Sequence, residues 1–172
     1  MALRRLLLAA VLLSLLVVTA ACKAEEGGDV QPTETKAEAS RRVDALVEEA
    51  FAQLPPGATR KPNVNVDSVP CDDPTDGGPA GRIFAERRDL IVPPSGGAWP
   101  VTDVFPTLIA FWEQQGYTTR IDGRSEREPR YSVGTPDGYI VIVNSWDRGD
   151  HVDISLGSTS PCIWENGTPD PQ

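Results

Sequence analysis

Residues 130–156 read RYSVGTPDGYIVIVNSWDRGDHVDISL, and this stretch decides the fold. Apolar and polar side chains alternate near both of its ends, and the apolar run Tyr139–Val143 lies between them. Alternation with a period of two is typical of a strand with one buried face. Two groups of turn-forming residues, 136–138 and 147–150, separate the apolar segments. We therefore expect three successive antiparallel strands, which we place at residues 130–135, 138–143 and 151–156.

Two more strands are expected upstream. Residues 117–121 continue the period of two and lead into a charged loop, so they add a first strand to a four-stranded meander. Residues 82–92 read RIFAERRDLIV and predict a further strand that ends at Pro93-Pro94. The segment 58–81 is dominated by turn-forming residues, and we expect a loop there with a brief strand within Val64–Val69.

A helix is expected after Thr35. Thr35 and Glu38 have the spacing of a capping box, and Pro55-Pro56-Gly57 stops the segment. Apolar residues recur between them with the 3.6-residue period of one helix face, at Val43, Leu46, Val47, Ala50, Phe51 and Leu54. We expect this face to pack into the core, because the opposite face is not basic, as it would be in a helix on a membrane surface.

A second helix is expected upstream of the meander. Thr102 or Asp103 caps it, and Pro106 falls in its first turn. Gly116 ends it. Its apolar stripe consists of Phe105, Leu108, Ile109 and Trp112, which is the spacing of a core-facing helix.

The predicted order is helix, strand, helix and then four strands, and each helix has a single apolar face. The simplest arrangement is a two-layer α+β sandwich, in which both helices cover one face of an antiparallel meander sheet. The length of 172 residues fits one such domain. We place it at residues 35–162 and place a Pro-rich C-terminal tail at residues 163–172.

The N-terminus has the layout of an export signal. Arg4 and Arg5 form a basic start, and residues 6–18 are almost all Leu, Val and Ala. Thr19-Ala20-Ala21 is a small-residue exit that leads to Cys22. This apolar run is too short to cross a hydrocarbon core of about 30 Å well. The layout therefore predicts a secretory signal.

The Ala-Ala-Cys junction resembles the lipobox of bacterial lipoproteins, and the whole chain looks like the small surface lipoproteins of high-GC Gram-positive bacteria. The resemblance implies that the thiol of Cys22 receives a diacylglycerol and that the signal peptide, residues 1–21, is cut off before it. It also implies a lipid anchor in the cell membrane, with the protein on the extracytoplasmic side. Residues 22–34 contain one large apolar residue, Val30, and we expect them to form a flexible tether.

The charge of the chain restricts its partners. Removal of residues 1–21 takes away two Arg and no acidic residue, which moves the net charge from -9 to -11. An acidic chain repels phosphate backbones, so nucleic-acid binding is not expected, and the lipid rather than a basic patch would hold the protein at the membrane. Arg87 and Arg88 are adjacent strand residues that face opposite sides, so we expect surface charges there and not an anion site.

Three Cys residues are present in the chain. If Cys22 carries the lipid, Cys71 and Cys162 remain, and oxidising conditions outside the membrane favour a disulfide between them. Zinc is the alternative for two Cys residues. The chain has no CxxC motif and one His, so we expect neither a metal nor a cofactor.

His151 is the only His, and a nucleophilic triad needs a base within reach of a nucleophile. Asp153 and Ser155 would be its neighbours on the outward face of its strand, about 6–7 Å apart and too far for the hydrogen bonds of a triad. Asp147, Asp150 and Asp153 lie near one turn and are a weak candidate for cation binding. Neither a G-x-S-x-G motif nor a Gly-rich phosphate loop occurs, so we expect no catalysis.

Three Trp residues lie outside the predicted apolar faces, in or near loops: Trp99, Trp146 and Trp164. Exposed aromatic side chains are typical binding anchors, and the alternative is that they cap the edges of the core. We therefore expect a non-catalytic binding or accessory module that recognises an envelope protein or another envelope ligand. The alternative function is an envelope hydrolase that uses carboxylates, which are plentiful throughout the chain.

Overall fold

The computed structural model describes residues 33–71, 81–94 and 101–169, apart from the side chains of residues 101 and 102. The predicted signal peptide, Cys22, most of the predicted tether and Trp99 lie outside the described residues. No helix within the described ranges is long and apolar enough to span a membrane.

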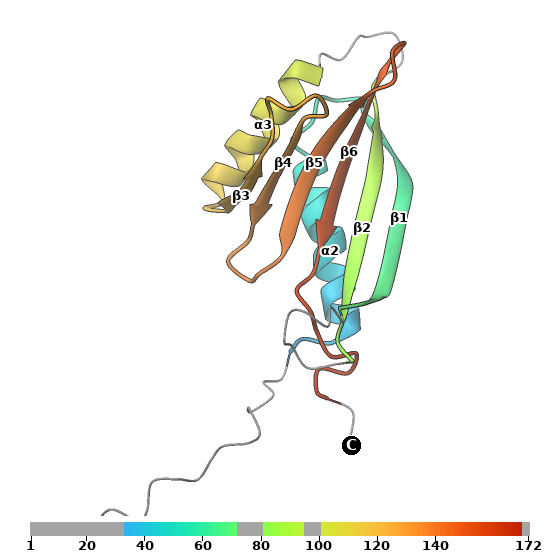
Figure 1. The fold of residues 1–172 in the computed structure, drawn as a ribbon, viewed down its shortest axis with the longest axis vertical. Coiled ribbons are helices and arrows are strands. Elements are labelled where there is room, and N and C mark those ends of the chain that lie inside the picture. The colour runs from blue at the N-terminus through green and yellow to red at the C-terminus, as the bar shows by residue number, and fades with distance from the viewer. Residues whose placement is uncertain (1–32, 72–80, 95–100, 170–172) are drawn as a thin grey trace, which may run out of the picture. The chain divides into compact units, whose positions relative to one another are not determined.

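The described chain folds into two helices and one antiparallel six-stranded sheet. The elements are α2 (Lys36–Phe51), β1 (Thr59–Pro70), β2 (Ile83–Val92), α3 (Val101–Gln114), β3 (Thr118–Asp122), β4 (Arg130–Gly134), β5 (Ile140–Asp147) and β6 (Val152–Thr159). The strand order is β1-β2-β6-β5-β4-β3, so β3 to β6 form the expected meander, and the β1–β2 hairpin joins it where β2 pairs with β6 (Figure 1). The predicted α+β fold is confirmed.

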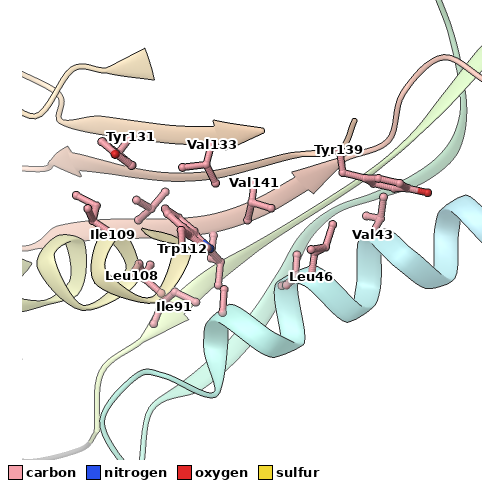
Figure 2. Packing of buried hydrophobic residues seen from close by; sticks show 14 of the residues in the cluster. Val43, Leu46, Ile91, Leu108, Ile109, Trp112, Tyr131, Val133, Tyr139 and Val141 are labelled. Carbon is pink, nitrogen blue, oxygen red and sulfur yellow. The ribbon is translucent and has the colours of Figure 1, made fainter. Parts of the chain in front are cut away.

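The core lies between the sheet and the two helices, which cover the same face of the sheet (Figure 2). Helix α2 packs on β2 and β6. Helix α3 contacts β4, where the ring of Trp112 stacks on Tyr131 with the ring centroids 6.2 Å apart. The predicted stripes of both helices are buried, except that Phe51 is only partly buried. Strand residues that face the helices include Ile91, Val133, Val141, Val143, Ile154 and Leu156.

The start of α2 is the predicted capping box. The backbone N–H of Glu38 donates to Thr35 Oγ1 at 3.3 Å, and the backbone N–H of Thr35 donates to Glu38 Oε2 at 2.8 Å. The bond from the Thr35 backbone keeps the pKa of the Glu38 carboxyl below its usual value. The box satisfies N–H groups that the first turn of a helix leaves without partners.

Strand β1 corrects the prediction for residues 59–70, where we expected a loop with a brief strand. It is a long edge strand that pairs with β2 from Thr59 to Pro70, with register shifts between Pro62 and Val64 and between Val66 and Val69. An edge strand tolerates Pro and exposes most of its side chains, so it lacks the apolar alternation that marks a central strand. The backbone pairing with β2 therefore explains why these residues form a strand better than their own composition does.

Helix α3 begins at Val101, which is earlier than the predicted start at Thr102 or Asp103. Pro106 therefore lies inside the helix and not in its first turn. A Pro inside a helix removes one backbone hydrogen bond. Phe105 and Leu108, which flank it, are buried in the core, so packing of the apolar face holds the helix in spite of the Pro.

The folded domain extends beyond both of its predicted boundaries. The backbone N–H of Thr33 donates to the carbonyl of Gly167 at 2.9 Å, and the backbone N–H of Trp164 donates to Thr33 Oγ1 at 2.9 Å. Ile163 is buried and pairs with Ile83. The last residues of the predicted tether and the first residues of the predicted tail therefore belong to the folded domain. Gly167 adopts a φ of 81°, and a Cβ there would lie 3.0 Å from the Thr33 carbonyl oxygen.

The predicted Cys pairing is confirmed. Cys71 and Cys162 form a disulfide, with their Cα atoms 6.0 Å apart. Cys71 follows β1, and its backbone N–H donates to the carbonyl of Arg82 at 2.9 Å. The disulfide therefore ties the β1–β2 hairpin to the segment that follows β6.

Candidate binding site on the outer sheet face

None of the described helices covers the second face of the sheet. We call it the outer face. A row of cross-strand partners runs across it, and along each strand these residues alternate with residues that face the core. The row consists of Lys61 on β1, Leu90 on β2, Ser155 on β6, Asn144 on β5 and Arg130 on β4. Cross-strand partners in a sheet face the same side. The outer face also carries exposed apolar side chains, among them Ile121 and Ile140, each 40% exposed.

The end of the outer face at which β4 begins and β5 ends holds an open pocket of about 220 Å³. Its lining comes from the β3–β4 loop, the start of β4 and the end of β5. The lining residues are Glu126, Glu128, Arg130, Asn144, Ser145 and Trp146. Most small-molecule sites are lined mainly by apolar side chains with a few polar groups, whereas this pocket has one aromatic side chain among several polar groups. We call this site the Trp146 pocket.

Backbone contacts fix the β3–β4 loop against β5. Gly123 donates its N–H to the carbonyl of Arg130 at 2.9 Å, and Ser145 donates its N–H to the carbonyl of Pro129 at 2.9 Å. A Cβ at Gly123 would lie 2.9 Å from Glu126 Cδ and 3.0 Å from Arg130 Cγ. The absence of a side chain at Gly123 therefore lets the side chains of Glu126 and Arg130 lie close to the loop backbone.

The pocket contains charges of both signs. Arg130 Nε lies 3.1 Å from Glu126 Oε2, and the two side chains are about equally exposed. Glu128 is also exposed, whereas Asn144 and Trp146 are partly buried. An exposed ion pair of this kind contributes little stability, so these side chains are free to exchange partners with a ligand.

His151 lies between β5 and β6 and is not part of a nucleophilic triad. It is 59% exposed; its Nδ1 lies 2.7 Å from Asp150 Oδ1, and its Nε2 lies 3.5 Å from Asp153 Oδ1. The hydrogen bond with His151 lowers the pKa of Asp150. Ser155 was expected to be outward and accessible, but it is fully buried, and its hydroxyl has no hydrogen-bond partner. Ser155 is therefore not hydrogen-bonded to His151 or to Asp153.

The three Asp residues near the β5–β6 turn have separate partners. Asp147 accepts the N–H of Gly149 at 2.7 Å, Asp150 contacts His151, and Asp153 accepts from Arg148 Nε at 2.8 Å. No group of three or more His, Cys, Asp or Glu side chains suitable for a metal ion occurs in the described part of the chain.

The three Trp residues have different positions. Trp146 lines the pocket, and its cross-strand partner on the outer face is Asp153. Trp164 is only 7% exposed, so it is not an exposed anchor and agrees with the alternative expectation, that it caps the edge of the core. It follows the buried Ile163 and lies where the two ends of the domain meet. The sequence does not reveal this burial, because Trp164 is a single aromatic residue next to a polar tail. Trp99 is outside the described residues.

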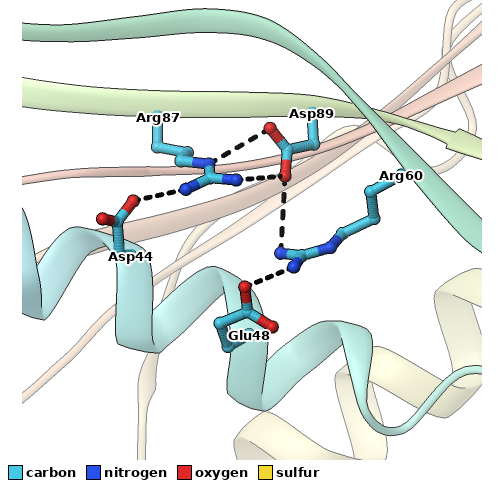
Figure 3. Close-up of polar contacts among 5 residues, drawn as sticks. All are labelled: Asp44, Glu48, Arg60, Arg87 and Asp89. Atoms are coloured by element: carbon cyan, nitrogen blue, oxygen red, sulfur yellow. Dashed lines mark hydrogen bonds and ion pairs between the residues drawn. The ribbon is translucent and has the colours of Figure 1, made fainter.

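A second cluster of charges lies between α2 and the β1–β2 hairpin and extends from a buried carboxylate to the surface of α2 (Figure 3). Asp89 is fully buried, and Arg87 contacts both of its oxygens, at 3.2 Å and 3.1 Å. Arg87 Nη1 also binds Asp44 at 2.7 Å, and Arg60 bridges Asp89 and Glu48. Hydrogen bonds to Asp89 and Asp44 raise the pKa of Arg87. We interpret this cluster as structural, because each of its members is already paired.

Arg87 and Arg88 face opposite sides of β2, as predicted, but only Arg88 lies on the outer face. Arg88 Nη2 lies 2.5 Å from Glu86 Oε1 there. The expected surface charge is therefore wrong for Arg87, whose side chain is only 18% exposed. Asp44 on α2, which is distant in sequence, is the acidic partner that makes the inward position of Arg87 favourable.

No protein family model, curated protein or solved structure matches this chain.

Proposed function

We propose that this protein is a lipid-anchored lipoprotein on the extracytoplasmic side of the cell membrane and a non-catalytic binding module of the envelope. The export signal and the lipobox-like Cys22 support the location. The Cys71–Cys162 disulfide agrees with an oxidising compartment. Thr33 already contacts the folded domain, so the lipid at Cys22 would be connected to it through the preceding part of the chain.

The observation that carries the binding function is the position of Trp146. Its partly buried indole lies in a pocket on the outer face of the sheet, together with an amide, a guanidinium and two carboxylates. Aromatic side chains in pockets are the commonest anchors of binding surfaces, and the polar groups around them provide specificity. The rigid β5 strand holds Trp146, so little ordering is needed when a ligand binds.

The alternative function, a hydrolase that uses carboxylates, has one observation in its favour: Glu126 and Glu128 share the Trp146 pocket. A general-acid carboxyl is kept protonated by burial in an apolar setting. Both Glu side chains are exposed, and Glu126 is bound to Arg130. Binding therefore fits the pocket better than hydrolysis does.

Co-sedimentation with isolated envelopes tests the proposed binding. The exported protein with Cys22→Ser, which cannot carry the lipid, should sediment with envelope material through its pocket. Trp146→Ala should leave most of the protein in the supernatant, whereas Ile121→Ala, a change on the same face outside the pocket lining, should behave as the parent does. Equal sedimentation of the Trp146→Ala variant would contradict the proposal.

Cell fractionation tests the anchor separately. The unaltered chain should be in the membrane fraction, and Cys22→Ser should move the protein to the soluble fraction, because a lipid attached at Cys22 is the proposed anchor. A Cys22→Ser variant that stays in the membrane fraction with unchanged processing of its signal would show that the lipid assignment is wrong.

A further inference from the structure

We infer that the ligand of the Trp146 pocket is a neutral saccharide. The inference rests on the proposed binding function and names the chemical class of the ligand. It is argued from the donors and acceptors of the pocket, from its charge and from its shape.

The lining of the pocket contains both hydrogen-bond donors and hydrogen-bond acceptors. The Arg130 guanidinium only donates, the Glu126 and Glu128 carboxylates only accept, and the Asn144 amide does both. Arg130 and Asn144 are cross-strand partners, so a donor and an acceptor lie side by side. A sugar hydroxyl donates one hydrogen bond and accepts others. Neighbouring hydroxyl groups on one ring can therefore match this mixed lining.

The charges of the pocket disfavour an anion and leave little for a cation to pair with. Arg130 is paired with Glu126 at 3.1 Å, and Glu128 adds a further negative charge. An anion would meet the two carboxylates, and a cation would find one carboxylate unpaired within the described residues, Glu128, beside the Arg130 guanidinium. A neutral polyhydroxyl ligand forms hydrogen bonds with both kinds of group and meets no like charge.

Trp146 supplies the apolar contact that a sugar needs. One face of a sugar ring presents C–H groups, which pack on the electron-rich face of an indole. The pocket, at about 220 Å³, is smaller than the roughly 300–1,000 Å³ of sites for drug-sized ligands, so it fits one small ring.

Calorimetric titration of the full exported protein in detergent micelles tests the inference. The probes are hexasaccharides of glucose, of N-acetylglucosamine and of arabinose, with free lysine and inorganic phosphate as charged competitors. Each probe is raised to about 10 mM, where a site with a Kd of about 1 mM is mostly filled. We expect at least one hexasaccharide to bind, and neither lysine nor phosphate to displace it.

Three variants connect the binding to the pocket. Trp146→Ala should weaken the affinity for that hexasaccharide at least about tenfold, and Trp146→Phe should weaken it less, because an aromatic face remains. Gly123→Ala leaves Trp146 in place but pushes on Glu126 and Arg130, so it should also weaken binding. Ile121→Ala, the matched control on the same face, should stay within about twofold.

The inference is overturned if no hexasaccharide binds, if lysine or phosphate takes its place, or if both Trp146 variants bind as the parent does. If the sugars fail while Trp146→Ala still abolishes co-sedimentation, the ligand class is wrong and the binding function stands. If co-sedimentation is also independent of Trp146, the proposed function fails with it.

Discussion

Asp89 is a charged residue with no exposed surface, and its environment explains why the fold tolerates it. Arg87 and Arg60 both contact its carboxylate, and each also reaches an acidic residue on α2, namely Asp44 or Glu48. Removal of a carboxylate from water costs several kcal/mol unless its partners are close. The cluster therefore fastens α2 to the β1–β2 hairpin.

We predict that Asp89→Asn destabilises the domain by about 3 kcal/mol, because both Arg side chains lose the buried charge that they share. The amide keeps the volume of the side chain, so packing is not the cause. The midpoint of urea unfolding of the exported protein measures the loss.

Glu86→Gln is the matched control for this prediction. Glu86 lies on the same strand but faces outward, where its pair with Arg88 is partly exposed. Such pairs contribute about 0–1 kcal/mol, so the urea midpoint should change little. Equal losses of stability for Asp89→Asn and Glu86→Gln would mean that burial of the charge is not the cause of the destabilisation.

Local periodicity predicts single residues well only where one face is apolar. The stripe from Val43 to Leu54 and the stripe from Phe105 to Trp112 are buried as expected. The inward position of Arg87 was not predicted, because its partner Asp44 is distant in sequence. The burial of Ser155 was not predicted either, since strand alternation alone places it on the outer face.

At the scale of elements, central strands were predictable and the edge strand β1 was not. β5 has the apolar run of a strand with neighbours on both sides, whereas β1 is an edge strand whose only strand neighbour in the described sheet is β2. The pairing partner of β2 on its other side, β6, is far away in sequence. Only the disulfide prediction, which links Cys71 to Cys162, indicated that these segments are close.

We expect the contact between Glu34 and Tyr139, which immediately precedes β5, to weaken at alkaline pH. Tyr139 is buried and donates its hydroxyl hydrogen to Glu34; burial first, and then this bond, raise the pKa of Tyr139. A pKa that is higher in the folded state gives stability that is fully present below the unfolded value of about 10 and is lost as pH rises through the folded value.

We therefore expect the urea midpoint of the parent protein to decrease as the pH is raised from about 8 to about 11. The decrease should be smaller in Tyr139→Phe, which has no hydroxyl to ionise. The variant should be somewhat less stable at about pH 8, by about 1 kcal/mol, because the bond to Glu34 is lost. Parallel pH profiles for the two proteins would exclude Tyr139 as the responsible group.

At the scale of the whole molecule, the disulfide between Cys71 and Cys162 closes most of the sheet into one covalent loop with a sequence separation of 91 residues. In the chain-entropy model such a loop is worth up to about 4.5 kcal/mol. We expect reductant, or Cys71→Ser combined with Cys162→Ser, to lower the free energy of unfolding by a large part of this amount. Two freely alkylatable thiols in the exported protein would contradict the pairing.

Only part of the candidate site could be predicted from the sequence. Trp146 stood out as an aromatic residue outside the apolar faces, and it lines the pocket. The loop that contains Glu126 and Glu128 and leads to Arg130 is charged, as any solvated turn can be. These residue types alone therefore do not indicate a binding site. What brings them to Trp146 is the antiparallel pairing of β4 with β5, together with the bond from Ser145 to Pro129.

The most direct test of the central claim, that an envelope ligand occupies the Trp146 pocket, is hydroxyl-radical footprinting of the full chain in intact cells and after purification. We expect Trp146 to be oxidised several-fold more slowly in cells, because a ligand covers its indole, while Ile121 on the same face is oxidised equally in both. Equal oxidation of Trp146 in cells and in the purified protein would show that the pocket is empty where the protein works, and the claim would be wrong.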